Sequence, residues 1–558
     1  MISAGNLGIF RAAIQTVLIT ALLFAAPLAR AVGEGCTAGA HTFCVTNTND
    51  TTDPGTLRTA ITSSNTAGGT NTIGFNIPGA GLHTISLSVT PLPLITSNLT
   101  IDGFTQPGSV QNTNAPDQGG LNGTLTIEIV GVGAAGFQRD GASILTLTFE
   151  GLALHGFSDV IAGQSGTLTP KTQLNVYGCF IGTKADGTAL PTQGNSGTAV
   201  RVGYDNAQIG GAQPWQRNLL SGNASAAVLT APADATSSVV IEGNLIGTDV
   251  TGTVAIANGS GFSNWPAIYI QGAARGVRVG CTGSGCLSKA SRNVISGNYK
   301  AGISITPLVG GTPYVGLEIK GNYIGLSWNG AAMPNGLPGA QYASFGSGIQ
   351  VTSNGNPTPA IIGGFGAGEA NVIAFNNGAG INANDVFGST SSYFDTRANQ
   401  VHDNIGPSAT EIAIGKFGVE PVANDAGDAD DGSNQQQNWP EIYTAEPVRV
   451  PGPGLAMKIT YKVTSAPANA VYPIRVDFHF AVHGGAGVWF AQDSYPSAAG
   501  QDYVTTTVPI TLPVVGGSPW YAFWGPIVAI ATSASGYSSE ISPVTNDWIF
   551  GDGFEAAP

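Results

Sequence analysis

The chain has 558 residues, more than one ordinary domain holds, so its length predicts several domains or one long repeat structure. It contains 80 Gly and 33 Pro, while 10% of its residues are charged and 42% are hydrophobic. This composition disfavours both a helical and a disordered protein and favours many short strands joined by tight turns. The net charge of −14 disfavours nucleic acid as a partner, because an acidic surface repels phosphate.

Residues 1–31 predict a secretory signal peptide. Arg11 precedes the apolar run Ala12–Pro27, and Ala29–Ala31 offers small residues at the two positions that a signal peptidase reads. A retained membrane anchor is the alternative, although the run is short for a membrane span. We expect a secreted chain, or one on the outer cell surface, with no membrane span in its mature part.

The five cysteines fit export to an oxidising compartment. Their spacing predicts two local disulfides, Cys36–Cys44 and Cys281–Cys286. Cys179 has no predicted disulfide partner, and we expect it to be a buried packing residue and not a reactive thiol. Zinc is disfavoured because neither pair has His partners at the usual spacing.

Three short phrases recur through the middle of the chain. The form Arg-Asn-Val-Ile-Ser-Gly-Asn recurs at spacings of 75 and 78 residues, which we divide into units of about 25 residues. A second phrase centres on Ile-Gly-Thr, and a third on Ile-Gly-Gly. The copies lie at Arg217–Asn223, Arg292–Asn298 and Ala370–Asn376; at Cys179–Thr183, Asn244–Thr248 and Asn322–Leu326; and at Ile209–Gly211, Val279–Cys281 and Ile362–Gly364.

Such a period, with short β-type pieces in each unit, predicts a parallel β-helix. A piece such as Val239–Glu242 is too short to be stable alone, but it gains a strand ladder when its copies stack at about 4.8 Å per step. The recurring Asn residues would then lie over one another, with their amides hydrogen-bonded along the axis. We expect a solenoid of roughly 15 coils from about Cys36 to about Glu420.

Beyond Asp431 the Asn/Gly phrases stop and alternating strands begin, at Lys458–Val463, Ile474–Phe480, Tyr503–Leu512 and Ile527–Thr532. This pattern predicts a β-sandwich of about seven strands. The expected organisation is a signal peptide at 1–31, a β-helix at 32–423, an acidic linker at 424–439, a β-sandwich at 440–546 and a tail at 547–558.

Several motifs resemble a family of secreted bacterial proteins. They are Ile246–Thr253, the repeated Arg-Asn-Val-Ile-Ser-Gly-Asn phrase, and Asn424–Asp430 leading to Asn438–Pro440. Members of that family are right-handed parallel β-helix repeat proteins with a C-terminal immunoglobulin-like module, and Thr532–Ser542 resembles the last strand of that module. The tail Ile549–Glu555 is similar to C-terminal endings of exported proteins in some Gram-negative bacteria. The resemblance implies fold and export, but the family has no uniform activity.

Known secreted β-helices are often polysaccharide lyases or glycoside hydrolases. A lyase needs a proton-abstracting side chain, and a hydrolase needs paired carboxylates. The densest mixed cluster of charged and titratable residues lies near the end of the predicted solenoid and could form a base-plus-carboxylate site. The alternative is a less regular last coil with a solvated loop. The candidate catalytic residues are Tyr393, Asp395, Arg397, His402 and Asp403, with Glu411 nearby.

Aromatic rings and arginines at the coil corners are candidates for glycan binding, because rings stack on sugar faces. Arg217 and Arg292, at equivalent positions three coils apart, would lie about 14 Å from each other and contact successive sugars. Corner and packing roles are the alternative. The candidate glycan-binding residues are Tyr204, Trp215, Arg217, Arg292, Tyr323 and Trp328.

The acidic segment around Gly427 and Gly432 is the best metal candidate, because closely spaced carboxylates suit Ca²⁺. Its spacing is not that of an EF-hand, and an acidic linker between domains is the alternative. The candidate calcium ligands are Asp425, Asp428, Asp430 and Asp431.

From the low charge content and the scattered aromatics we expect a secreted or cell-surface protein that binds an extracellular polysaccharide or surface glycan, or that acts in adhesion. The alternative hypothesis is a polysaccharide lyase or glycoside hydrolase acting on an extracellular polysaccharide.

Overall fold

The structure is a computed structural model of the whole chain. It describes residues 33–88, 91–140, 144–163, 172–203, 205–230, 238–260, 265–271, 276–306, 316–337, 346–352, 359–384, 393–405, 411–414, 422–429, 432–450, 455–510 and 526–545. The expected signal peptide and C-terminal tail lie outside these residues.

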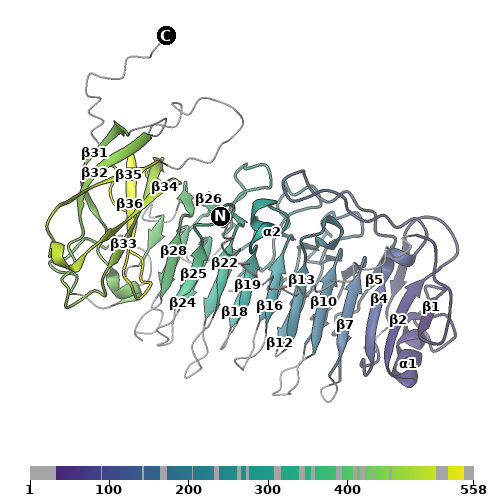
Figure 1. Cartoon of the computed structure of the whole chain (residues 1–558). Helices are drawn as coiled ribbons and strands as arrows, with labels where there is room; N and C mark the ends of the chain where they lie inside the picture. The colour runs from purple at the N-terminus through teal and green to yellow at the C-terminus, as the bar shows by residue number, and fades with distance from the viewer. Residues whose placement is uncertain are drawn as a thin grey trace, which may run out of the picture. The chain divides into compact units, whose positions relative to one another are not determined.

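The protein is all-β and is dominated by parallel sheets whose strands are stacked side by side (Figure 1). The largest purely parallel sheet, of 11 strands, contains β1 (Thr42–Val45), β2 (Thr70–Phe75), β4 (Asn98–Asp102), β7 (Thr146–Glu150), β10 (Gln173–Tyr177), β13 (Asn206–Gly210), β16 (Val239–Glu242), β19 (Val277–Gly280), β22 (Glu318–Lys320), β25 (Ala360–Gly363) and β28 (Phe394–Arg397).

Two more parallel stacks accompany this sheet, and one pass of the chain through all three makes one coil. The 9-stranded sheet contains β6 (Phe137–Gln138), β9 (Ile161–Ala162), β12 (Val200–Gly203), β15 (Val228–Thr230), β18 (Ile268–Gln271), β21 (Ile303–Thr306), β24 (Ile349–Thr352), β27 (Ile381–Asn384) and β30 (Ile412–Ala413). The parallel part of the 13-stranded sheet contains β3 (His83–Ser86), β5 (Ile127–Val130), β8 (Ala153–His155), β11 (Phe180–Ile181), β14 (Leu219–Leu220), β17 (Leu245–Ile246), β20 (Val294–Ile295), β23 (Tyr323–Ile324), β26 (Val372–Ala374) and β29 (Gln400–His402).

This arrangement is compatible with the predicted parallel β-helix, and its core explains why such short strands are stable. Alternate residues of each strand point inward, and their copies stack in register on the neighbouring strands. One inward row of the 11-stranded sheet is nearly completely buried. Its members include Ile101, Phe149, Val176, Ile209, Ile241, Val279, Ile319 and Ile362.

Two asparagine ladders run along the stack and confirm the predicted stacking of Asn over Asn. In each ladder, the side-chain amide of one Asn donates to the side-chain oxygen of the next at 2.8–3.1 Å. The first ladder contains Asn195, Asn223, Asn258, Asn298, Asn335, Asn376 and Asn404; the second contains Asn218, Asn244, Asn293, Asn322, Asn371 and Asn399. All thirteen residues are at most 3% exposed, so the ladders are internal.

The predicted coil length of about 25 residues is wrong. The chain takes 26 residues from Asn218 to Asn244 but 49 from Asn244 to Asn293, so the 75-residue repeat spans two coils and not three. Loops of unequal length cause the difference, among them the loop closed by the Cys281–Cys286 disulfide. Over the described residues the longest parallel sheet has 11 strands, fewer than the roughly 15 coils expected.

A helix covers the first coil. α1 (Leu57–Ala67) begins at Thr56, whose hydroxyl accepts a hydrogen bond from the Thr59 N–H. Its apolar side is buried in the main core through residues such as Ile61, which is 0% exposed. The helix therefore supplies the end cap that a solenoid needs. The other α-helix in the described chain is the short α2 (Ser284–Leu287).

The C-terminal region is antiparallel and has a hydrophobic cluster of its own. Met457, Tyr461, Phe478 and Phe490 are fully buried there. One group of strands is β33 (Ile474–Val482), β34 (Gly485–Tyr495) and β36 (Ile527–Thr532), which joins β29 through the pair Val401 and Ala486. The other is β31 (Glu441–Arg449), β32 (Leu455–Lys462) and β35 (Val504–Pro509). The strands predicted from alternation correspond to β32, β33, β35 and β36.

Both predicted disulfides are confirmed, with Cα–Cα distances of 5.6 Å for Cys36–Cys44 and 4.9 Å for Cys281–Cys286. Cys179 is free and buried, and burial raises the pKa of its thiol to about 12. The disulfides are compatible with an extracellular protein. Within the described residues, no helix is long and apolar enough to span a membrane.

The ladders predict the largest stability losses among polar substitutions in the stack. In Asn298→Ala, the Asn258 amide loses its acceptor and the Asn335 oxygen loses its donor, all inside the protein. We expect the free energy of unfolding in urea to fall by about 2–4 kcal/mol. Asn49→Ala, at an exposed position, should change it by less than about 0.5 kcal/mol. Equal losses in the two variants would contradict a structural role for the ladders.

Candidate functional site

The outer side of the 11-stranded sheet carries two rows of polar side chains, which we call the polar face. Strand alternation points these residues away from the core, and the parallel register repeats them at about 4.8 Å per coil. Most of them are partly exposed. The first row contains Thr100, Thr148, Asn175, Gln208, Val240, Arg278, Glu318, Ile361 and Asp395, of which only Val240 and Ile361 are apolar. The second row, two residues further along each strand, contains Asp102, Glu150, Tyr177, Gly210, Glu242, Gly280, Lys320, Gly363 and Arg397.

Tyr177 is the central aromatic residue of the second row. It pairs in register with Glu150 on β7, and its ring meets that of Trp215 edge to face, with centroids 5.7 Å apart. On the next strand Gly210, which follows the partner of Val176, places no side chain beside it. Burial, together with Glu150 and Glu242, raises the pKa of Tyr177 to about 12, so its hydroxyl stays protonated and can donate a hydrogen bond.

Charged residues of the polar face bond to one another. Glu242 accepts hydrogen bonds from Gln208 Nε2 at 3.1 Å and from Arg278 Nη1 at 2.9 Å. One coil further on, the Lys320 ammonium lies 3.1 Å from the Glu318 carboxylate. These bonds hold the side chains in place, so the face presents a fixed pattern of donors and acceptors.

The corresponding outer row of the 9-stranded sheet is much less accessible. Leu229, Ser304, Gln350 and Asn382 occupy it, and they are between 0% and 7% exposed. Tyr269, in the same row, is partly exposed and packs edge to face on Trp265 at 5.5 Å. The polar face is therefore the more accessible of these two surfaces.

The predicted glycan-binding arginines are mostly inside the protein. Arg217 is 1% exposed and donates to the carbonyls of Asn114, Gly119 and Gly243, and burial lowers its pKa to about 10. Arg292 is 9% exposed, and its guanidinium lies 4.0 Å from the centre of the Tyr323 ring. The two arginines lie two strand steps apart, not three, which corresponds to about 10 Å.

The predicted aromatic residues lie around a small second hydrophobic cluster. Trp215, Tyr323 and Trp328 pack partly buried against it, and Trp328 Nε1 donates to the Thr251 carbonyl at 3.0 Å. Of these, Trp215 borders the polar face through its contact with Tyr177. Tyr204 lies outside the described residues.

The candidate catalytic residues separate into two groups at the end of the stack. Asp395 binds Arg397 through one oxygen and Arg475, on β33, through the other, at 2.9 and 2.8 Å. Tyr393 stacks on Tyr537 at 4.3 Å. Both carboxylate oxygens of Asp395 are thus engaged, and the one bonded to Arg475 joins the last coil to the C-terminal strands.

The second group is a His402–Asp403–His483 chain. Asp403 contacts His402 Nδ1 at 2.8 Å and His483 Nδ1 at 2.7 Å. Partial burial raises the pKa of Asp403, but its contacts with the two histidines outweigh this and hold it below the usual value. Glu411 lies next to this chain, close enough for the Asp403 charge to act on its pKa, and it ends the first ladder by accepting from Asn404 Nδ2 at 2.6 Å.

The two described members of the predicted calcium set bond to protein donors. Asp428 is 5% exposed and accepts from Asn438 N–H, Gln437 Nε2 and the Ser465 hydroxyl at 2.9, 2.8 and 2.6 Å. Asp425 accepts from the Ala429 N–H. Asp430 and Asp431 lie outside the described residues. In the described part of the chain, no group of three or more His, Cys, Asp and Glu is placed to hold a metal ion.

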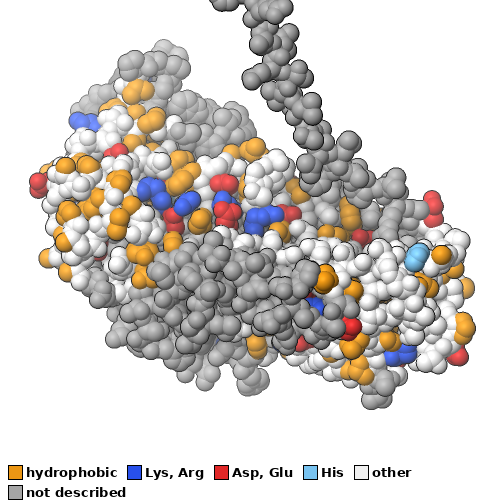
Figure 2. All heavy atoms as spheres, turned by 60° about the horizontal axis from the view of Figure 1, so that its bottom comes forward, with side chains coloured by type: hydrophobic (Ala, Val, Ile, Leu, Met, Phe, Trp, Pro, Cys, Tyr) orange, Lys and Arg blue, Asp and Glu red, His pale blue; other side chains and the backbone are white. Residues whose placement is uncertain are grey.

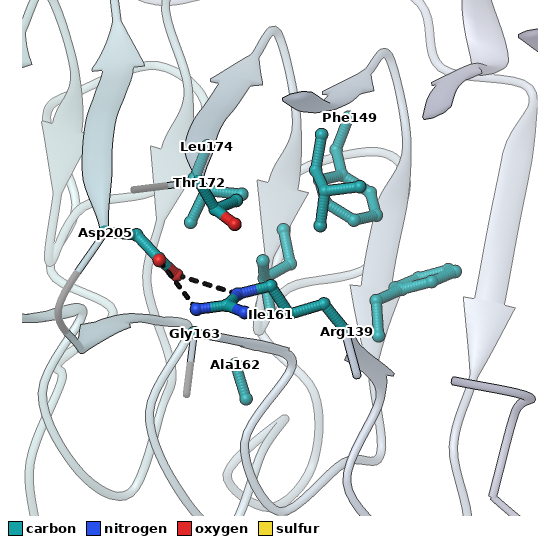
Figure 3. A pocket seen from close by; sticks show the side chains of 10 residues that line it. Arg139, Phe149, Ile161, Ala162, Gly163, Thr172, Leu174 and Asp205 are labelled. Atoms are coloured by element: carbon teal, nitrogen blue, oxygen red, sulfur yellow. Dashed lines mark hydrogen bonds and ion pairs between the residues drawn. The ribbon is translucent and has the colours of Figure 1, made fainter. Parts of the chain in front are cut away.

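A small pocket lies inside the stack, lined mainly by apolar residues such as Phe149 and Leu174 (Figure 3). Arg139 and Asp205 point toward each other there and form a two-point ion pair, with Nη2–Oδ1 at 2.8 Å and Nε–Oδ2 at 3.3 Å. Both side chains are 3% exposed, so this pair links from within two coils that are two strand steps apart.

The polar face was not predicted from the sequence, although one signal for it was present. Gln208, Arg278 and Ile361 each stand two residues before the first Gly of an Ile-Gly-Gly-type phrase, and all three point outward in one row. Figure 2 shows acidic and basic side chains gathered beside one another on one face of the described chain.

Comparison with known proteins found no matching family model and no matching curated protein. The resemblance to secreted bacterial β-helix repeat proteins remains a prediction.

Glu411 predicts a specific pH dependence of stability. Burial raises its pKa from 4.5 to about 7, so between these values the folded state holds a proton that the unfolded state releases. The contribution of Glu411 to the free energy of unfolding should therefore fall as pH rises from about 4.5 to about 7, and it should be constant above about pH 7. Thermal unfolding midpoints over this range should fall less steeply in Glu411→Gln, which keeps an oxygen acceptor for Asn404, than in the wild type. Parallel profiles would contradict the assignment.

Proposed function

We propose that the chain is a secreted or cell-surface protein that binds glycans or acts in adhesion, and that the polar face is its binding surface. The finer architecture in this proposal is a right-handed parallel β-helix followed by an immunoglobulin-like β-sandwich, exported by a Gram-negative-type bacterium. The observation that carries the proposal is the partly exposed and mostly polar row that runs along the 11-stranded sheet.

The side chains of the polar face have the chemistry that sugars need. Sugar hydroxyls both donate and accept hydrogen bonds, and the amide of Asn175 can do the same. The amide nitrogen of Gln208 donates to Gly210 and Glu242, so this side chain offers its oxygen as an acceptor. Tyr177 and Trp215 add aromatic surface for the C–H faces of a sugar ring. Because the rows run along the stack, a linear polymer laid along them would contact side chains of several successive coils.

The charge balance favours a neutral glycan. The chain carries a net charge of −14, and the three cations Arg278, Lys320 and Arg397 on this face are each bonded to a carboxylate. A polyanion would therefore meet repulsion that these paired cations do not offset. An uncharged polysaccharide would not meet this electrostatic repulsion.

Binding is tested with the mature chain, residues 32–558, against soluble neutral polysaccharides (hydroxyethylcellulose, xylan and galactomannan) and polygalacturonate as an acidic polymer. We expect retardation in affinity gels by at least one neutral polymer. Tyr177→Ala should weaken that binding about fivefold, because it removes the stacking ring. Tyr269→Ala is the matched control, since Tyr269 has a similar edge-to-face Trp partner outside the polar face.

The same incubations test the alternative hypothesis. Unsaturated sugar products would show a lyase, and new reducing ends without unsaturated products would show a hydrolase; either result would overturn a purely binding role. Equal binding by both tyrosine variants would remove the polar face from the proposal.

A further inference from the structure

The antiparallel sheet of β31, β32 and β35 has one face in the C-terminal hydrophobic cluster and one toward solvent (Figure 1). Along β32, Ile459 and Tyr461 are 0% exposed. The alternate residues Lys458, Thr460 and Lys462 therefore lie on the outer face. The pairing of β32 with both neighbours brings residues of all three strands together there.

Two tyrosines stand next to each other on this outer face, which we call the tyrosine face. Tyr443, on β31, is 72% exposed, and Tyr503, just before β35, is 50% exposed. Their ring centroids are 5.5 Å apart and the ring planes meet at 52°. Of the tyrosines that the structure describes, these two alone are exposed. Neighbouring exposed rings indicate an interaction surface, since packing inside the protein does not account for them.

Hydroxyl and charged side chains surround the rings. Lys462 Nζ lies 5.2 Å from the centre of the Tyr503 ring and 3.1 Å from the Glu441 carboxylate. In the next register position, the Thr460 and Thr505 hydroxyls are 2.9 Å apart. An apolar protein partner would have to bury these groups, whereas a sugar can hydrogen-bond to them.

The charges on the tyrosine face cancel. Glu441 pairs with Lys462, and its hydrogen bond raises the pKa of that lysine, which therefore stays charged and paired at neutral pH. Glu446 stands opposite Lys458 in the register. The face therefore offers no excess charge to attract a polyanion or a polycation.

We propose that the tyrosine face is a second glycan site, in which Tyr443 and Tyr503 stack on consecutive sugar rings of a neutral polysaccharide. The inference rests on the proposed function and extends it, because this site lies on strands separate from the polar face. The 5.5 Å separation and tilted planes of the rings suit neighbouring sugars of a twisted chain better than one flat ligand.

The test uses the full mature chain and the neutral polymer that it binds best among hydroxyethylcellulose, xylan and galactomannan. The double variant Tyr443→Ala/Tyr503→Ala should bind about tenfold more weakly by calorimetry, while Tyr443→Phe/Tyr503→Phe, which keeps both rings, should stay within about threefold of wild type. Val471→Ala is the control, because Val471 is an exposed apolar residue of the same region at 53% exposure. The polymer should also protect Tyr443 and Tyr503 from nitration, read by peptide mass spectrometry.

The outcomes separate the two proposals. Suppose that the wild type binds, that the alanine double variant binds equally well and that the polymer does not protect the two tyrosines. This result would overturn the second site but not the polar face. Loss of binding in Tyr177→Ala alone would likewise overturn the second site. If the wild type binds no polymer of the panel, the proposed function fails and this site fails with it.

Discussion

The register between stacked parallel strands is the constraint on which this structure depends. The parallel strands have two to six residues each, too few to be stable alone, so each relies on its neighbours for hydrogen bonds and apolar contacts. A slip of one residue would turn the inward row outward and break both asparagine ladders. The ladders oppose such a slip, because each amide has its partner at one register only.

The same register arranges the surface. Because the strands are in parallel register, outward residues form rows just as inward residues do. These outward rows make the polar face from strand residues alone. Two sets of charged side chains lie within the protein, the Arg139–Asp205 pair and Arg217. They are tolerated there because each guanidinium binds a carboxylate or several carbonyls. At the end of the stack, Asp395 and Asp403 form contacts with the C-terminal strands through Arg475 and His483.

Local patterns in the sequence predicted much of the fold. The repeated phrases indicated stacked asparagines, close cysteine spacing indicated both disulfides, and alternation indicated four C-terminal strands. The coil length was wrong because loops of unequal length interrupt the repeat, so one ladder step takes 26 residues and the next 49.

The site residues were harder to interpret, because their environment comes from distant segments. From the sequence alone, Arg217 is interpreted as a corner residue. In the structure, a loop 103 residues earlier in the chain supplies the Asn114 carbonyl as its acceptor. From the sequence alone, Asp403 is interpreted as a free carboxylate. In the structure, His483, 80 residues later in the chain, contacts it. No local pattern contains such partners, whereas the outward row of the polar face follows from strand alternation once the register is known.

The most direct test of the register is a distance between spin labels on its outer row. Labels at Asn175→Cys and Ile361→Cys would lie five strand steps apart, and buried Cys179 should remain unlabelled. Pulsed electron paramagnetic resonance should give about 24 Å between their attachment points. A distance near 36 Å, expected for coils of about 25 residues, would contradict the stacking and with it the polar face.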